Sequence, residues 1–378
     1  MVSPLHEQSA ALGERKRIRA LCIAACIAAL LATLWPCNPF TRNGVSWLQG
    51  NRGLKFEFPG LIVSKEYLKP EEIQATESYS LELLVRPANR KSGTILAFYN
   101  DTHPTQLLVG QDGERLLVTD DNGIQSDRTR TIKFHSDHIL RPGRLVLVTI
   151  TSGLNGTTLY LDGKAEGSFP LIKFSGSELS GQIVLGTSPS MYEPWAGELR
   201  GLAIFSKELS PRESLQHYRE WTKPGSAHDL DRAIVHYAFA EGVGREIRDD
   251  VPSGPNLEVP AIFSVPHKAF LCSAKKEFKA NWTYAKDVVV NIAGFIPLGL
   301  IACAYLSWIK NRWKAILTAA LACGLLSFVI EVLQYYIPQR FSGTTDIITN
   351  TLGAAVGAAI MQAGVVRRTF KELKLIRS

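Results

Sequence analysis

Apolar runs lie only at the two ends of this chain, and that segregation limits the folds it can adopt. One run covers residues 20–36, and three more cover residues 288–308, 315–337 and 347–366. Each is close to the roughly 20 residues that a helix needs to cross the hydrocarbon core of a bilayer. Residues 41–279 mix charged, polar and apolar side chains as a water-soluble domain does. We therefore expect a four-span membrane protein that carries one large soluble domain.

The basic residues predict how the chain is oriented. The formal net charge is +7, and most of the positive excess lies beside the apolar runs, in residues 15–19, 310–314 and 367–377. Short segments rich in Lys and Arg stay on the cytoplasmic side of a membrane. With both termini cytoplasmic, all three clusters lie on the cytoplasmic side of the plasma (inner) membrane, and residues 41–279 lie on its outer side. Because this explains the basic residues, we expect no nucleic-acid partner.

The first apolar run could be an anchor or a cleaved signal peptide. The residues that close it, Leu34-Trp35-Pro36-Cys37, contain no small-x-small cleavage site, which favours an uncleaved anchor. The expected domains are a basic N-terminus, an anchor helix, an exterior β domain, a linker, three membrane helices and a basic tail. Their bounds are 1–19, 20–36, 46–263, 264–286, 287–366 and 367–378.

Two of the six cysteines lie outside the apolar runs. Cys37 follows the first run and Cys272 precedes the second, so they flank the exterior domain. An oxidising exterior would allow a disulfide between them. The alternative is that they are two unrelated small apolar residues.

The middle of the chain reads as an all-β sandwich. Short β-prone runs alternate with turn signals, and the expected strands cover residues 80–86, 94–99, 145–150, 158–161 and 182–186. Asp162-Gly163 supplies the positive φ angles that tight hairpins need, as do Asp112-Gly113 and Asn155-Gly156. One helix is expected from Pro211, because Ser210 and Glu213 form the pattern of a capping box.

Three segments of this region resemble a laminin-G or concanavalin-A-like jelly roll, over roughly residues 46–263. They are Leu159-Tyr-Leu-Asp-Gly-Lys, Trp195-x-Gly-Glu-Leu-x-Gly-Leu-Ala-Ile-Phe and Tyr237-x-Phe-x-Glu-Gly-x-Gly. The resemblance implies a domain that binds a glycan or a protein partner, sometimes through calcium. The E-x-D-x-E strand of the related glucanases does not occur in the sequence, which favours a non-catalytic binding domain.

Aromatic side chains on loops are the candidates for contacting a sugar, because an aromatic face can stack on the apolar face of a sugar ring. The ligand-binding candidates are Trp47, Tyr192 and Trp195. Packing in the domain core is the alternative for each of them, and it is the favoured one for Trp195, which lies inside a strand-like motif.

The second and fourth apolar runs begin with one shared motif, D-[VI]-[VI]-x-N-x-x-G, at Asp287 and at Asp346. A spacing of four places each Asp on the same helical face as its Asn, Asn291 or Asn350. The third run approaches from the opposite direction with a polar stripe, and an arginine follows it. We expect one polar cluster formed by Asp287, Asn291, Ser327, Glu331, Gln334, Arg340, Asp346 and Asn350.

An ionisable side chain inside a membrane span is a functional candidate by default, because burying it is costly. Asp287 and Asp346 could instead be helix N-caps, and the two Asn residues could hold helices together. Gly353-x-x-x-Gly357 could equally be a close-packing seam between helices.

The same residues resemble the VanZ-like family. The carriers are Asn291-x-x-Gly-Phe-Ile-Pro-Leu-Gly, Ser327-x-x-Ile-Glu-x-x-Gln-x-x-x-Pro-x-Arg and Asp346-x-x-x-Asn-x-x-Gly-x-x-x-Gly. The family's four-span unit would take the N-terminal anchor as its first helix, with the sandwich inserted in the first external loop. The family is named after an accessory protein of resistance to the glycopeptide teicoplanin. The resemblance thus implies a bacterial envelope protein, without specifying a reaction.

Two functions remain open at this stage. In the first, the sandwich binds an envelope glycan or protein and the helices, in contact with membrane lipid, anchor it or signal; this non-enzymatic function is favoured. In the second, Asp287, Glu331 and Asp346 act as acids and bases or hold a divalent cation, calcium or magnesium, the only cofactor considered. Arg340 would then hold the phosphate or carboxylate of a lipid-linked substrate. The oligomeric state is left open.

Overall fold

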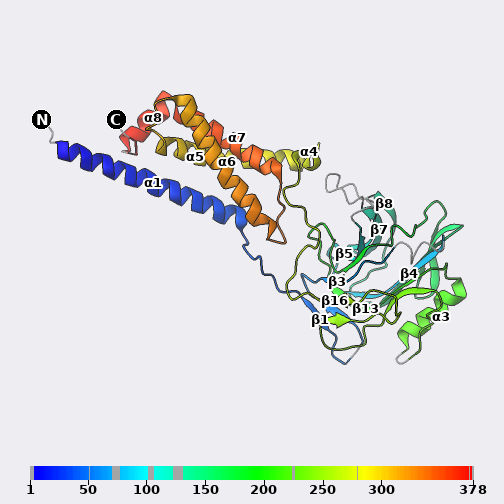
Figure 1. The fold of residues 1–378 in the computed structure, drawn as a ribbon. Coiled ribbons are helices and arrows are strands. Elements are labelled where there is room, and N and C mark those ends of the chain that lie inside the picture. The colour runs from blue at the N-terminus through cyan, green and yellow to red at the C-terminus, as the bar shows by residue number, and fades with distance from the viewer. Residues whose placement is uncertain are drawn as a thin grey trace. The chain divides into compact units, whose positions relative to one another are not determined.

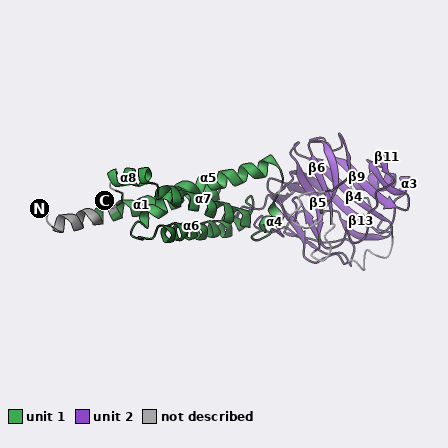
Figure 2. Ribbon diagram, turned by 90° about the horizontal axis from the view of Figure 1, so that it is seen from above, with its two compact units in different colours: residues 1–39, 269–378 green, residues 40–268 purple. Residues whose placement is uncertain are grey.

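The computed structural model divides the chain into two compact units, which are described separately. Unit 1 comprises residues 1–39 and 269–378, and unit 2 comprises residues 40–268 (Figure 2). The structure describes residues 4–50, 52–69, 77–100, 106–121, 131–223, 226–278, 280–373 and 375–376.

Unit 2 is a sandwich of two antiparallel sheets, as predicted (Figure 1). One sheet has the order β1-β2-β13-β4-β9-β10-β11, with β14 paired to β13. Its strands are β1 Val45–Trp47, β2 Leu54–Phe56, β4 Tyr79–Pro87, β9 Val146–Gly153, β10 Gly156–Leu161, β11 Lys164–Phe169, β13 Gly197–Phe205 and β14 Ala233–Tyr237.

The second sheet has the order β15-β16-β3-β12-β5-β6-β7-β8. Its strands are β3 Ile62–Ser64, β5 Gly93–Tyr99, β6 Gln106–Asp112, β7 Arg115–Asp121, β8 Thr131–Ser136, β12 Gln182–Leu185, β15 Glu246–Ile247 and β16 Leu257–Glu258. Each of the five strand regions expected from the sequence coincides with a strand of the two sheets, apart from Leu145 and Gly186, which lie one residue outside β9 and β12.

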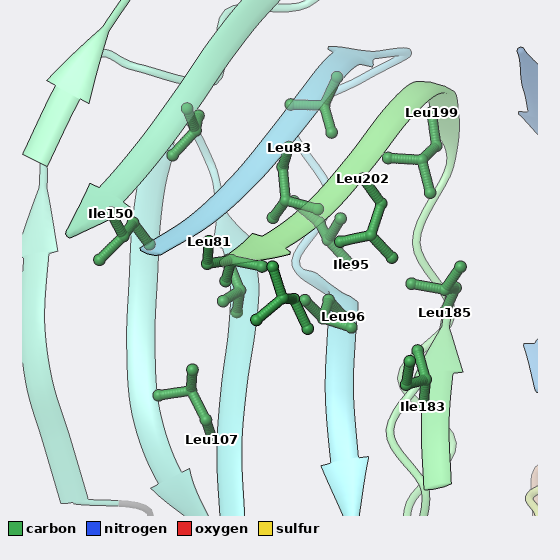
Figure 3. Packing of buried hydrophobic residues seen from close by; sticks show 14 of the residues in the cluster. Leu81, Leu83, Ile95, Leu96, Leu107, Ile150, Ile183, Leu185, Leu199 and Leu202 are labelled. Atoms are coloured by element: carbon green, nitrogen blue, oxygen red, sulfur yellow. The ribbon is translucent and has the colours of Figure 1, made fainter. Parts of the chain in front are cut away.

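The core of unit 2 lies between the sheets, where alternate residues of the strands meet. Figure 3 labels ten of these buried side chains: Leu81, Leu83, Ile95, Leu96, Leu107, Ile150, Ile183, Leu185, Leu199 and Leu202. Burying a leucine or isoleucine side chain stabilises a fold by about 1.5–3 kcal/mol. Strand β4 is also buried on its other face, at Ser80 and Glu82, because helix α3 (Pro211–Thr222) covers that face of the sheet.

The local signals of the sandwich form as expected. Ser210 caps α3, its side chain accepts from the Glu213 backbone N–H, and the Glu213 carboxylate accepts from the Ser210 N–H at 2.8 Å. In the β10–β11 turn, Asp162 and Gly163 have φ angles of 49° and 75°, the left-handed conformation that a tight hairpin requires.

Unit 1 is helical. Its helices are α1 Pro4–Leu34, α4 Ala274–Glu277, α5 Trp282–Tyr305, α6 Arg312–Tyr335, α7 Thr344–Met361 and α8 Gly364–Glu372. Residues 15–34 of α1, together with α5 and α6, are long and apolar enough to cross a membrane. Helices α7 and α8 meet at a bend of 76° and provide a fourth span if they are counted together. The last apolar run, expected to continue to Val366, is therefore interrupted after Met361, and Arg367, Arg368 and Lys371 lie on α8.

Helices α5 and α7 pack backbone against backbone. A Cβ atom built on Gly353 would lie 2.2 Å from the Ile292 carbonyl oxygen, and one built on Gly357 would lie 1.9 Å from the Ile296 carbonyl oxygen. The contacts advance together along both helices, so α5 and α7 run parallel. Gly353-x-x-x-Gly357 thus forms a close-packing seam of the kind that small residues allow in membranes.

Candidate functional site

The first turn of α7 binds two carboxylates from other helices. Glu331 of α6 is 1% exposed, and its Oε2 accepts a hydrogen bond from the Gly343 N–H at 2.7 Å. The Oε2 of Glu277, on α4, accepts from the Thr345 N–H at 2.9 Å. The first N–H groups of a helix have no partner within the helix and carry partial positive charge. Glu331 and Glu277 therefore complete the start of α7.

The segment before α5 is also fastened to this turn through its backbone. The Cys272 N–H donates to the Ser342 carbonyl at 2.9 Å, and the Cys272 carbonyl accepts from the Thr344 N–H at 2.8 Å and from Thr344 Oγ1 at 3.0 Å. These bonds bring Glu277 to α7. Glu277 was not a candidate in the sequence, where it lies in a charged segment with no motif.

Asp346 connects α7 with α5 and α6. Its Oδ1 accepts from Asn291 Nδ2 of α5 at 2.7 Å, and its carboxyl group lies within hydrogen-bonding reach of that of Glu331. One turn further along α7, Asn350 Nδ2 donates to Ser327 Oγ of α6 at 2.9 Å. The structure thus brings together five of the eight residues expected in the polar cluster.

Of the other three expected members, two make hydrogen bonds to a different segment, and the third is exposed. Gln334 Nε2 donates to the Thr33 carbonyl at 2.9 Å, and Arg340 Nη2 donates to the Trp35 carbonyl, so both hold the end of α1. Asp287 is exposed in the second turn of α5, whose N-cap is Asn281. Within the described ranges, no ion pair joins Arg340 to an acid, and no hydrogen bond joins Asp287 to the cluster.

Several polar atoms near the start of α7 are buried without a hydrogen-bond partner. They are Arg340 Nε, Ser342 Oγ, Thr345 Oγ1 and Asn350 Oδ1. In the part of the chain that the structure describes, no group of three or more His, Cys, Asp or Glu side chains is arranged to hold a metal ion. A calcium or magnesium ion at Asp287, Glu331 and Asp346 remains a prediction from the sequence.

Cys37 and Cys272 are not joined in the structure. All six cysteines are described, and all six are free thiols. Cys272 is buried in the segment that pairs with residues 342–344, whereas Cys37 is exposed after the end of α1. The disulfide that the sequence allows between them is therefore not formed in this structure.

The three aromatic candidates of the sandwich differ in exposure. Trp195 is 1% exposed; its ring packs on Phe56 at 5.8 Å and its Nε1 donates to Gln111 Oε1 at 2.7 Å. Trp195 therefore packs in the core, the alternative that its strand-like motif favoured, and its ring does not reach the surface. Trp47 is half-buried, with its Nε1 bound to the Gly244 carbonyl at 2.9 Å.

Tyr192 lies on the surface of the sandwich between two other rings. It meets the buried Phe263 at 5.7 Å and Phe58 at 5.9 Å, both edge to face. Phe58 is 53% exposed, and Lys91 Nζ lies 5.5 Å from the centre of its ring. Phe58 and Lys91 were not candidates in the sequence. An aromatic residue before Pro-Gly, in a loop, is the signal that could have identified Phe58.

A buried polar network lies between α3 and its sheet. The carboxylate of Glu82 accepts from Trp221 Nε1 at 2.8 Å and Thr149 Oγ1 at 3.2 Å, and its Oε1 lies 3.2 Å from His217 Nδ1. Burial lowers the pKa of His217, but the hydrogen bond and charge of Glu82 outweigh burial and raise it overall. Burial also lowers the pKa of His228 to about 4. Every oxygen of Glu82 is thus engaged inside the domain.

The two units define a membrane protein with an added lectin-like sandwich, and comparison with known families agrees. Residues 245–366 match the VanZ/LLP1 family, and residues 64–213 match the concanavalin A-like lectin/glucanases superfamily. The chain therefore carries a VanZ-like membrane domain and a concanavalin A-like domain. No curated protein sequence matches it.

Solved structures resemble parts of the chain at low identity. The binding domain of Botulinum neurotoxin DC, in complex with rat synaptotagmin II, is 16% identical, with a TM-score of 0.35, over 50% of this chain and 49% of that one. A SAP-like pentraxin from Limulus polyphemus is 13% identical, with a TM-score of 0.36, over 57% and 93%. A proposed carbohydrate-binding protein of Bacteroides ovatus is 13% identical, with a TM-score of 0.37, over 57% and 60%. The chain thus spans about half the length of the first of these structures.

Proposed function

We propose that this protein binds an envelope glycan or an envelope protein through its sandwich and couples that binding to its VanZ-like helices in the plasma membrane. The two family matches on one chain support the two parts of this proposal. The proposed orientation follows the basic clusters: both termini are cytoplasmic and the sandwich lies outside.

The observation that carries the proposal is that carboxyl groups in both units are hydrogen-bonded within the protein. Glu331 and Glu277 each bind a backbone N–H of α7, and Asp346 binds Asn291. In the sandwich, Glu82 is engaged by Trp221 and Thr149. Acids that are committed to holding helices and strands together favour a binding protein over an enzyme, because a general acid or base must be available to a substrate.

One contact favours the enzyme alternative. The carboxyl groups of Glu331 and Asp346 lie within hydrogen-bonding reach of each other, as the two acids of an acid–base pair do. In this second candidate function, the pair would act on a lipid-linked or envelope substrate at the outer leaflet, with the exposed Asp287 as a third carboxylate.

The test uses the full-length protein in lipid nanodiscs, applied to an array of bacterial envelope glycans and to envelope extracts. We expect specific capture of a glycan or protein, and the same capture by Glu331→Gln and Asp346→Asn variants that remain folded. The proposal fails if the wild type captures neither class of ligand. The enzyme alternative gains support if both variants fold and bind normally but fail to restore the wild-type teicoplanin susceptibility of a deletion strain.

A link to teicoplanin resistance is part of the same proposal and has its own readout. We expect deletion of the gene from its bacterial host to change the minimum inhibitory concentration of teicoplanin. An unchanged value in the deletion strain, with the wild-type protein expressed and folded in the parent, would remove this link and leave ligand binding untouched.

A further inference from the structure

Three loops of the sandwich meet at one aromatic surface. Phe58 follows β2, Lys91 lies between β4 and β5, and Tyr192 lies between β12 and β13. The Phe58 and Tyr192 ring centres are 5.9 Å apart, and Lys91 Nζ is 5.5 Å from the centre of the Phe58 ring. We call these three residues the aromatic-lysine surface. Loops held by a sandwich are where binding residues commonly lie.

The rings are held rigidly from below. Tyr192 packs edge to face on Phe263, which is fully buried. The loop that carries Phe58 is fixed by its backbone, because Gly44 and residues 57–59 exchange two hydrogen bonds of 2.8 Å. A ligand that contacts Phe58 therefore meets a surface that is already ordered, which reduces the entropy lost on binding.

Buried Trp195 positions the loop that carries Lys91. Trp195 Nε1 donates to Gln111 Oε1 at 2.7 Å, and Gln111 Nε2 donates to the Asn89 carbonyl at 2.7 Å, two residues before Lys91. The Lys91 N–H in turn donates to Asn89 Oδ1 at 2.8 Å. Trp195, one of the three ligand-binding candidates, thus supports the aromatic-lysine surface from inside the domain.

The charged residues around the surface pair with one another, so the ammonium group of Lys91 is available to a ligand. Arg90 pairs with Glu114 at 2.6 Å, and Glu57 pairs with Lys55 at 2.7 Å. Among the described residues, no ion pair occupies Lys91, whose side chain is exposed. A lysine of this kind offers a point charge to a carboxylate or phosphate.

We propose that the aromatic-lysine surface binds an anionic sugar, with the apolar face of the sugar ring on Phe58 and its carboxylate or phosphate at Lys91. The proposal rests on the proposed function and names the site and ligand class within it. A single exposed ring beside one charge matches the small apolar face of a sugar. A protein partner would ordinarily require about 800 Å² of contact surface on this side.

The test compares three probes that share an N-acetylated sugar ring. N-acetylglucosamine is neutral, N-acetylmuramic acid adds a lactyl carboxylate, and N-acetylglucosamine 1-phosphate adds a phosphate. Binding to the full-length protein in nanodiscs is measured at low and high salt. We expect both anionic probes to bind more tightly than the neutral one, with the preference reduced at high salt because an exposed ion pair is screened.

Two substitutions separate the ring from the charge. Phe58→Ala should weaken all three probes about two- to tenfold, the range for the loss of one aromatic contact. Lys91→Gln should leave the neutral probe unchanged and reduce the anionic preference about two- to fivefold, the range for an exposed ion pair. Lys173→Gln and Leu171→Ala, at two other exposed positions, are the matched controls and should change nothing.

Each contrary result identifies which proposal fails. If the wild type captures an envelope glycan but Phe58→Ala and Lys91→Gln bind it as the wild type does, the aromatic-lysine surface is wrong and the proposed function stands. If the wild type binds the neutral and anionic probes equally, the ligand class is wrong. If the wild type captures only envelope proteins, glycan recognition fails at this surface. An unchanged melting temperature confirms that each variant is folded.

Discussion

The sandwich and the helices of this protein are packed by opposite means. In the sandwich, large side chains such as Phe98 and Leu96 fill the space between two sheets and are fully buried. In the helical unit, Gly353 and Gly357 let α7 approach α5 until there is no room for a methyl group. A protein core is sensitive both to lost volume and to added volume. The sandwich should therefore fail when atoms are removed, and the α5–α7 seam when atoms are added.

The largest expected effect is the loss of a core aromatic ring. Phe98→Ala in β5 should lower the free energy of unfolding of the sandwich by about 3–5 kcal/mol, because it removes buried surface and leaves a cavity. Thermal unfolding followed by circular dichroism of the β-rich unit measures this change. Leu171→Ala is the control, since Leu171 is 99% exposed and its loss should have almost no effect. A similar loss in both variants would contradict the comparison.

Adding one methyl group should damage the helical seam. Gly357→Ala places a Cβ 1.9 Å from the Ile296 carbonyl oxygen and should destabilise the helical unit by about 1–3 kcal/mol through overpacking. Gly294→Ala is a control on α5, at a glycine where a Cβ would meet no atom within 4 Å. Unfolding of the helices in mixed detergent micelles measures both changes. Equal stability of the two variants would disprove the seam.

The two motif aspartates should also separate. Asp346→Ala removes the acceptor of Asn291 and should cost the helical unit about 1 kcal/mol, a usual value for a side-chain hydrogen bond between membrane helices. Asp287→Ala should cost less than about 0.5 kcal/mol, because Asp287 is exposed. The same detergent titration applies. If Asp287→Ala destabilised the helical unit more than Asp346→Ala, the α5 copy of the motif, and not the α7 copy, would be the one that stabilises the unit.

The smallest expected effect is a pH dependence of the sandwich. Burial raises the pKa of Asp249 to about 6, so the fold favours its protonated form. The stability that this preference contributes is complete below the unfolded pKa of 3.8 and is lost as the pH rises through about 6. Asp249→Asn keeps an acceptor oxygen for the N–H groups of His236 and Val251, which now bind Asp249 Oδ1.

The measurement is the difference in melting temperature between wild type and Asp249→Asn at several pH values. Between about pH 4 and pH 6.5, the wild type should lose about 2 °C or more relative to the variant, the change expected for part of a kcal/mol in a domain of this size. Other titrating groups cancel in the difference. If the difference in melting temperature does not change with pH, Asp249 is not the source of a pH-dependent stability.

The sandwich could be predicted from the sequence because its signals are local. The capping box at Ser210 and the Asp162-Gly163 turn depend on residues within a few positions of each other, and strand alternation is visible over short windows. The exposure of an aromatic side chain is not local in this sense. Trp195 was a binding candidate and Phe58 was not, yet strand register and the course of the loops place Trp195 in the core and Phe58 on the surface.

The candidate site in the helices was predicted in part for the same reason. Residues spaced by four on one helix, such as Asp346 and Asn350, had to share a face. The partner of Glu277, Thr345, lies 68 residues along the chain, and the Trp35 carbonyl lies 305 residues from Arg340. No pattern within a single helix specifies such a pair. Arg340 was accordingly expected beside the acids, whereas it holds the end of α1.

The attachment of Cys272 to the start of α7 has a consequence for domain exchange. The N–H and carbonyl of Cys272 and the carboxylate of Glu277 complete the first turn of α7, although both residues precede α5 in the chain. Residues 269–277 therefore belong to the membrane unit, and a foreign domain grafted in place of the sandwich should replace residues 40–268 only. A graft that extended to α5 would leave the first turn of α7 without the hydrogen-bond partners that Cys272 and Glu277 supply.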